Sequence, residues 1–406
     1  MPDNVERSAP PRRLLVLMAL ACGVGVANVY FPQAITPLLA ADLRVPVASA
    51  ALVATMAQVG YAIGIFFLVP LGDRISRRPL VTGLFGVVAV GMLVSGCAAD
   101  LPLLCVLGVL VGAATVVPQI LIPMAADLTD PKTAASVVGV LQGGLLAGIL
   151  LARAFGGALG EWLGWRAPYI VAGVVAVLLA VVLAIALPST TSSSTASYPN
   201  LLRTSLRLFA TLTELRRSCL YQAMLFGGFT GAWTSLALLV TGPAYGLGTS
   251  VVGLIALVGA ASVFLVPVAG RWIDRRGPDV VNLVGIIGAI AAAALLLTGL
   301  VGGVGGLVGL TAGMLVLDVA VQSSQVANQA RIFALDPGAR SRLNSVYMTS
   351  VFVGGSFGSL IATRIFVGFG WAAVCMSVAI AALVALVRCV VRRDQAVSVP
   401  PGAATR

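Results

Sequence analysis

Histidine is absent from this sequence of 406 residues, and charged residues make up only 10% of it. The six cysteines do not show the spacing of metal ligands. Without histidine, catalysis by a Ser-His-Asp set is excluded, and no glycine-rich loop that would hold a phosphate is present. The sequence therefore predicts no metal, no cofactor and no enzymatic activity, and it leaves a membrane-embedded enzyme or a sensor as a distant alternative.

The scarcity of charge also excludes an ordinary soluble domain, in which about 25% of residues are charged. Hydrophobic residues make up 59% of the chain, and they form runs of about 20 residues, which is the length of a membrane-spanning helix. The runs predict twelve spans, at about 14–39, 47–70, 80–98, 102–125, 136–157, 167–187, 220–243, 250–270, 280–300, 306–328, 344–366 and 371–391.

The net charge of +11 is distributed as expected for a membrane protein. Arginines gather in the loops that this topology places in the cytoplasm, with Arg44 and Arg166 as the two external exceptions. The positive-inside rule then places both termini in the cytoplasm, and we expect a multi-pass protein of the bacterial inner membrane. No contiguous basic face remains for nucleic acid.

The middle of the chain divides it into two parts. Residues 188–200 are rich in Ser and Thr, and 201–217 alternate polar and apolar residues with the period of a helix that lies on a membrane surface. We therefore expect a six-helix bundle over 1–187, a cytoplasmic linker over 188–219 and a second six-helix bundle over 220–406. We expect the protein to be a monomer.

An internal repeat supports this division. Asp73 and Asp274 are 201 residues apart, and each lies in a charged hairpin between two apolar runs. The sequence Gly143-Gly144, followed by Arg153, matches Gly354-Gly355, followed by Arg364, 211 residues later. Duplicated bundles of this kind are typical of transporters.

Three motifs carry a resemblance to a known family. The hairpin 69–78 is similar to the signature G-x-L-A-D-R-x-G-R-R, and 270–278 is a second copy of it. Residues 139–148 are similar to the motif G-x-x-x-G-P-x-x-G-G of antiporters. The chain thus resembles the major facilitator superfamily, in the 12-span branch of drug or metabolite:proton antiporters.

The resemblance implies an all-α membrane protein with twelve transmembrane helices in two pseudo-symmetric six-helix bundles, and a transporter that works by alternating access. Its partners would be a small-molecule substrate, protons and the lipid bilayer. Efflux in exchange for protons is the function that it implies, and proton-coupled uptake of a metabolite is the alternative.

The resemblance also implies a cytoplasmic gate made of hairpin residues. These are Asp73, Arg74, Arg77, Arg78, Asp274 and Arg275. Carboxylates and guanidinium groups at this position can pair across the mouth of the transporter. They can instead serve only to fix the topology and to anchor the loops to lipid phosphates.

Asp318 is the acidic residue that lies near the middle of a predicted span. A carboxyl group at that depth is costly, so we expect it to be protonated, paired or turned toward a cavity, and it is the candidate for proton coupling. A structural hydrogen bond is the alternative. Arg153 and Arg364 could bind an anionic substrate, pair with Asp318, or extend to the membrane surface.

Polar residues within the spans predict a substrate cavity, although hydrogen bonds between helices would explain them too. The candidates are Asn28, Tyr30, Gln33, Gln119, Arg153, Gln322, Gln325 and Arg364. Glycines form small-residue faces on two spans, and we expect these faces to pack at the interface between the halves. They are Gly139, Gly143, Gly144, Gly148, Gly354, Gly355 and Gly358.

Overall fold

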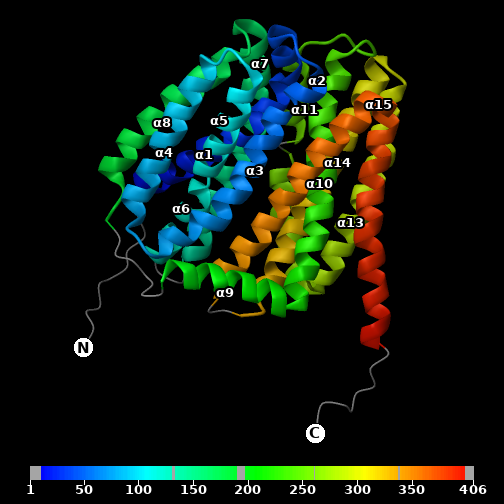
Figure 1. Ribbon diagram of the computed structural model, residues 1–406. Helices are drawn as coiled ribbons and strands as arrows, with labels where there is room; N and C mark the ends of the chain where they lie inside the picture. Colours follow the sequence, from blue (N-terminus) through cyan, green and yellow to red (C-terminus); the bar gives the residue numbers. More distant parts are fainter. Residues whose placement is uncertain (1–10, 130–132, 190–196, 260, 337–338, 398–406) are drawn as a thin grey trace, which may run out of the picture.

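The computed structural model describes residues 11–129, 133–189, 197–259, 261–336 and 339–397 (Figure 1). Within these residues every regular element is a helix, which confirms the predicted all-α class. The apolar composition requires this, because backbone N–H and C=O groups inside a bilayer must bond within their own segment. The helices form two groups that follow one another along the chain and stand side by side.

The first group contains α1 (Arg12–Leu43), α2 (Val47–Ala50), α3 (Leu52–Phe67), the 3₁₀ helix η1 (Val69–Asp73), α4 (Arg77–Gly96), α5 (Leu101–Ala114), α6 (Val117–Asp127), α7 (Ala134–Leu163) and α8 (Arg166–Ala186). The second group contains α10 (Thr213–Thr241), α11 (Thr249–Gly259), α12 (Ser262–Arg276), α13 (Pro278–Leu296), the 3₁₀ helix η2 (Leu297–Leu300), α14 (Gly303–Phe333) and α15 (Arg340–Val397).

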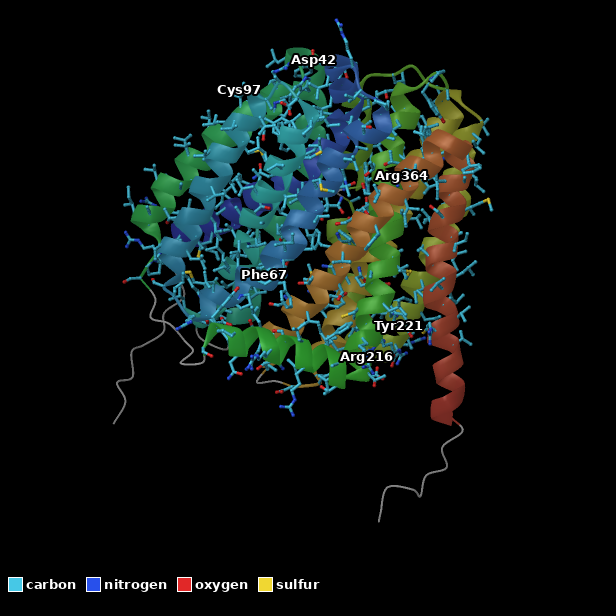
Figure 2. All side chains as sticks on the ribbon, viewed as in Figure 1. Asp42, Phe67, Cys97, Arg216, Tyr221 and Arg364 are labelled. Carbon is cyan, nitrogen blue, oxygen red and sulfur yellow. The ribbon has the colours of Figure 1, made fainter. Side chains whose placement is uncertain are left out.

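Helix α9 (Tyr198–Thr211) connects the groups and lies across one end of the molecule (Figure 1). The chain approaches both of its termini at this same end, which we name the linker end; the opposite end is the far end. Arg203 and Arg207 of α9 are exposed, as the amphipathic pattern predicts. The helix is shorter than predicted, because the last residues of the predicted segment 201–217 already belong to α10. Arg216 is one of these residues, and Figure 2 shows it at the linker end.

Ten helices of the described residues are long and apolar enough to cross a bilayer. The predicted span 250–270 is divided between α11 and α12, and the predicted spans 344–366 and 371–391 are both contained in α15. Each of the twelve predicted segments therefore coincides with helix, while the number of membrane crossings itself stays a prediction.

Helix α15 consists of two helical pieces that meet at Gly370. Its φ of 74° and ψ of −171° are not helical, and glycine adopts a positive φ without the steric cost that a Cβ would impose. In Figure 1 the piece before this residue rises toward the far end, and the piece after it returns toward the C-terminus.

Backbone-to-backbone packing joins α1 to α7 in the first group. A Cβ added at Gly148 would overlap the carbonyl oxygen of Gly23, and one added at Gly144 would overlap that of Ala19. Small residues permit such close approach of two helices in a membrane. The two backbones are therefore in direct contact at this crossing.

The same crossing occurs between α10 and α15 in the second group. A Cβ at Gly358 would overlap the carbonyl oxygen of Gly227, and one at Gly354 would overlap that of Ala223. The structure therefore equates Ala19 with Ala223, 204 residues later, and it equates the two pairs of glycines in the same way. The two groups are built on one repeated contact.

The glycines lie elsewhere than our prediction placed them. The four that make these crossings pack within a group and not between the halves. Gly139 and Gly143 have no atom within 4 Å of an added Cβ, so they belong to no close crossing of the described residues. Gly355 differs, because an added Cβ would lie 2.7 Å from Oε1 of Gln58 in the first group.

We expect Gly148→Ala and Gly358→Ala each to lower the free energy of unfolding by about 1–3 kcal/mol, because overpacking forces the backbones apart. Gly139→Ala is the matched control on the same helix as Gly148, in open space. The measurement is the thermal unfolding midpoint of the detergent-solubilised protein. Equal midpoints for Gly148→Ala and Gly139→Ala would show that the crossing does not contribute to stability.

Candidate functional site

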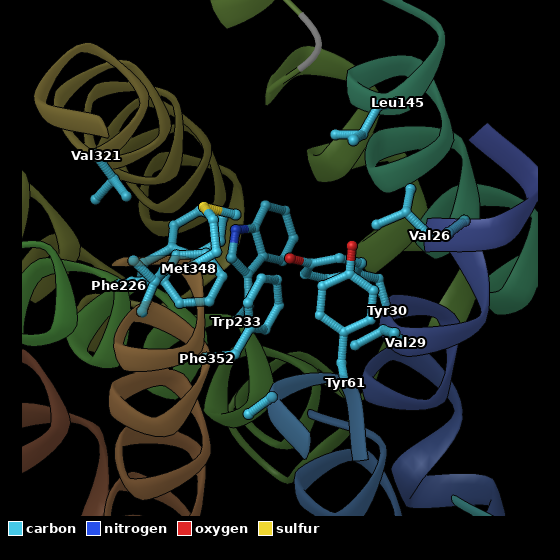
Figure 3. Packing of buried hydrophobic residues seen from close by; sticks show 14 of the residues in the cluster. Val26, Val29, Tyr30, Tyr61, Leu145, Phe226, Trp233, Val321, Met348 and Phe352 are labelled. Carbon is cyan, nitrogen blue, oxygen red and sulfur yellow. The ribbon is translucent and has the colours of Figure 1, made fainter. Parts of the chain in front are cut away.

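Arg153 of α7 is buried between the two groups of helices, with none of its surface exposed. Its Nε donates a hydrogen bond to Oε1 of Gln33, 3.1 Å away on α1. Three rings enclose its guanidinium: Cζ lies 4.9 Å from the ring centre of Tyr30, 5.7 Å from that of Phe229 and 4.3 Å from that of Trp233. Tyr30 belongs to α1, whereas Phe229 and Trp233 belong to α10, so the cation is held by both groups. Figure 3 shows Tyr30 and Trp233 facing one another from the two groups. Such cation–π contacts gain strength when they are desolvated.

Asp318 of α14 supplies the opposite charge. It is 2% exposed, and its carboxyl group lies against Gly259 at the end of α11. The charges of Asp318 and Arg153 attract one another without a direct ion pair. The indole N–H of Trp233 also faces the carboxyl group, at a geometry short of a hydrogen bond.

Several polar atoms of this layer are buried without a hydrogen-bond partner in the described residues. They are Nη1 and Nη2 of Arg153, Nε1 of Trp233, Nε2 of Gln33 and Oδ2 of Asp318. Buried polar groups are normally hydrogen-bonded, so a cluster of this kind marks a candidate functional site. We name Gln33, Arg153, Trp233 and Asp318 the polar layer.

A cavity of about 260 Å³ lies on the linker side of the polar layer. It is lined by Val26, Tyr30, Tyr61, Gln119, Gln142, Leu145, Leu146, Ile149, Phe226, Phe229, Gln322, Gln325, Val326, Gln329, Val351 and Phe352. Arg153 follows Ile149 by one helical turn, Trp233 follows Phe229 by one turn, and Asp318 precedes Gln322 by one turn. The polar layer thus borders the cavity on the side of the far end.

The predicted cavity residues do not all line the cavity in the structure. Tyr30, Gln119, Gln322 and Gln325 line the cavity, and the polar layer holds Gln33 and Arg153. Asn28 is turned away: its Nδ2 donates to the carbonyl oxygen of Val24 at 3.0 Å, on its own helix.

Arg364 is exposed and lies outside this site (Figure 2). This corrects the prediction that it lines the cavity at the place equivalent to that of Arg153. The crossings place Gly144 opposite Ala19 and Gly354 opposite Ala223, so the true offset between α7 and α15 is 210 residues and not 211. The counterpart of Arg153 is therefore Thr363, which is 2% exposed. A shift of one residue turns a helical side chain by about 100°, which carries Arg364 away from the centre.

Sequence reasoning missed most of the aromatic lining. Tyr61, Phe226, Phe229, Trp233 and Phe352 all lie inside predicted spans, where an aromatic side chain facing lipid and one facing a cavity look the same. Gln142 carried a usable signal, because amides are costly within a span, whereas Gln329 lies one residue beyond the predicted span 306–328.

At the linker end, the hairpin arginine Arg77 is 9% exposed. Its Nη1 lies 2.7 Å from Oδ2 of Asp127 at the end of α6. Asp73 lies near Arg77 and also near Arg342, which belongs to the second group. Arg74 is exposed and Arg78 is half-buried. In the second hairpin Arg275 is exposed, and the side chain of Asp274 lies outside the described residues.

The second group carries an equivalent ion pair with the charges exchanged. Asp279 at the start of α13 pairs with Arg331 at the end of α14, and Arg217 lies 3.4 Å from the same carboxylate. In the first group the arginine starts α4 and the aspartate ends α6. The sequence signal for Asp127, Asp279 and Arg331 was their spacing, because Asp127 and Arg331 are 204 residues apart.

Hydrogen bonds join the two groups at the far end and on the linker side of the cavity. At the far end Oγ1 of Thr249 donates to the carbonyl oxygen of Gly157 at 2.9 Å, and the backbone N–H of Ser250 donates to Glu161 at 2.7 Å. On the linker side of the cavity, Nδ2 of Asn344 in the second group donates a hydrogen bond to Oε1 of Gln119 in the first group at 3.4 Å. Hydrogen bonds between the groups therefore lie on both sides of the cavity, between side chain and backbone at the far end and between two amides toward the linker end.

A family model described as Major Facilitator Superfamily matches residues 14–335. The chain is 38% identical to the "Putative uncharacterized transporter YgaY" of Escherichia coli (strain K12), over 92% of this chain and 94% of that protein. It is 35% identical to the "Probable transporter SCO4007" of Streptomyces coelicolor, over 90% of this chain and 84% of that protein.

Solved structures share the fold. A mutant form of the nucleoside transporter NupG superimposes with a TM-score of 0.73 and 12% identity, covering 94% of this chain and 99% of that one. A bacterial homolog of the human lysosomal transporter Spinster, in an inward-facing and unoccupied conformation, gives 0.65 and 18%, covering 96% of each. Together with the family model and the curated relatives, these likenesses confirm the resemblance found in the sequence: the chain belongs to the Major Facilitator Superfamily and is a membrane transporter of that kind.

Proposed function

We propose that this transporter exports a small molecule in exchange for protons, by alternating access between two rocking bundles, 1–187 and 220–406. The observation that carries the proposal is the polar layer, in which Asp318 of one bundle lies near Arg153 of the other. This layer borders the central cavity on the side of the far end. The antiporter-like sequence 139–148 favours exchange over uptake.

The linker end is the cytoplasmic side in this proposal. Arg203, Arg207 and Arg216 lie along α9 and the start of α10 at that end, and an excess of arginine marks cytoplasmic segments. Because hydrogen bonds between side chain and backbone join the bundles at the far end, the structure corresponds to a form that is closed to the outside. The cavity then receives its substrate from the cytoplasm, through the amide bridge between Gln119 and Asn344.

Asp318 couples this motion to protons because its charge state alters the energy of packing the polar layer. Burial penalises a carboxylate, and the nearby guanidinium of Arg153 offsets part of that penalty. Adding a proton removes the charge and the attraction together. When the far end opens, the same carboxyl group meets the external solution, so it takes up and releases its proton on different sides of the membrane.

The substrate is to be found by a growth screen of a strain that expresses the protein against a panel of toxic compounds and metabolites. Export predicts resistance to the substrate and a lower cellular content of it. A compound that accumulates in the expressing cells would identify uptake instead.

We expect Asp318→Asn to abolish substrate-driven proton movement in liposomes, measured with a pH-sensitive dye inside the vesicles. Asp100→Asn, which removes an exposed carboxylate at the start of α5, is the control and should transport as the unmodified protein does. The double variant Arg153→Gln/Asp318→Asn removes both buried charges, so it should regain thermal stability relative to Asp318→Asn without regaining coupling. Unchanged proton movement in Asp318→Asn would remove this residue from the mechanism.

A second prediction concerns the gate at the linker end. Asp73→Asn removes the attraction toward Arg342 of the other bundle, so we expect the inward-facing form to become more populated. A single cysteine at Gln325 in the cavity, with the six native cysteines replaced, should react faster with a membrane-impermeant maleimide added from the linker side and more slowly when it is added from the far side. Arg203→Gln, at an exposed position of α9 outside the hairpins, is the control. Equal labelling rates in Asp73→Asn and its parent would argue against a gate.

A further inference from the structure

One wall of the cavity is a continuous row of aromatic rings. The ring centres of Tyr61 and Phe352 are 4.4 Å apart, those of Phe352 and Phe226 are 5.2 Å apart, and those of Phe226 and Phe229 are 5.6 Å apart. Figure 3 shows Tyr61, Phe352 and Phe226 close together beside Trp233. The row begins on α3 of the first group and ends on α10 of the second. Flat ring faces of this kind favour a flat aromatic ligand, because offset and edge-on ring pairs are attractive.

The other side of the cavity carries amides. Gln322, Gln325 and Gln329 follow one another at helical spacing on α14, and Gln119 and Gln142 lie on α6 and α7 of the first group. A glutamine amide both donates and accepts hydrogen bonds, so it matches a ligand that has both kinds of group on its edge. In the described part of the chain, the side chains of Gln142, Gln322 and Gln325 make no hydrogen bond, and they are available to a ligand.

No charged side chain lines this cavity within the described residues. Of the two charges in the polar layer, Arg153 is fully buried against the rings of Tyr30 and Phe229, and Asp318 is 2% exposed. A charged ligand would lose its hydration here without gaining a counter-ion, and that loss costs several kcal/mol. The lining therefore discriminates against both anions and cations.

We propose that the cavity binds an uncharged, flat heteroaromatic molecule of one or two rings with donor and acceptor groups on its edge. Its volume of about 260 Å³ is just below the range of roughly 300–1,000 Å³ usual for small-molecule sites, which limits the number of rings. The role of this molecule as the exported substrate rests on the proposed function. Its binding does not, because the rings and amides act in the absence of any gradient.

The test uses three bicyclic probes of nearly the same shape and different charge. They are quinoline-3-carboxamide, which is neutral, quinoline-3-carboxylate, an anion, and N-methylquinolinium-3-carboxamide, a cation. Calorimetric titration of the full chain in lipid nanodiscs gives each Kd. We expect the neutral probe to bind at least about tenfold more tightly than either ion. A difference of about 1.4 kcal/mol in binding free energy corresponds to that factor, and the cost of burying an unpaired charge exceeds it. Equal or tighter binding of an ion, or no binding of any probe, overturns the proposal.

A charge placed in the amide wall should invert this preference. Gln325→Glu should favour the cation over the neutral probe, whereas Thr211→Glu, which adds the same charge at an exposed position of α9, should leave the order of the three probes unchanged. An unchanged order in Gln325→Glu would show that the probe binds elsewhere.

The failures of the two proposals are distinguishable. If the neutral probe binds in nanodiscs but liposomes show no exchange of it for protons, the proposed function fails and the binding site stands. If a charged compound from the growth screen is exchanged for protons while the neutral probe does not bind, the ligand class fails and the transporter mechanism stands.

Discussion

A guanidinium group held between two bundles, out of reach of water, is the constraint on which this structure depends. Arg153 cannot be buried alone, because an isolated charge in a low-dielectric interior is strongly disfavoured. It is tolerated because Gln33 accepts a hydrogen bond, three rings enclose it and Asp318 attracts it. Both bundles contribute to that support.

The repeated architecture explains how this centre is placed. The α1–α7 crossing and the α10–α15 crossing hold equivalent helices of each bundle together by the same kind of close backbone contact. The ion pairs at the linker end follow the same symmetry with exchanged charges, Arg77 with Asp127 and Arg331 with Asp279. The symmetry is broken at the polar layer, because the place of Arg153 is taken by Thr363 in the second bundle.

The sequence was sufficient for the class of fold and for the family, since runs of apolar residues must become helices in a bilayer and the hairpin 69–78 is specific. Burial of Asp318 was also predictable from its depth in a span. Rotation about each helix was not. A repeat aligned on Gly143-Gly144 was one residue out of register, and that error moved Arg364 from the surface to the centre. The aromatic row was missed because only packing tells a ring that faces a cavity from one that faces lipid.

The glycine crossing between α1 and α7 has a consequence for how the cage around Arg153 comes apart. The close contacts at Gly144 and Gly148 join α1 to α7, so in the proposed rocking motion these helices would tilt together. Tyr30 and Gln33 would then move with Arg153, whereas Phe229 and Trp233 would stay with α10. The guanidinium would keep the ring of Tyr30 and the amide of Gln33 as it is exposed. Its freed side is the one that a water molecule or an approaching carboxylate would meet first.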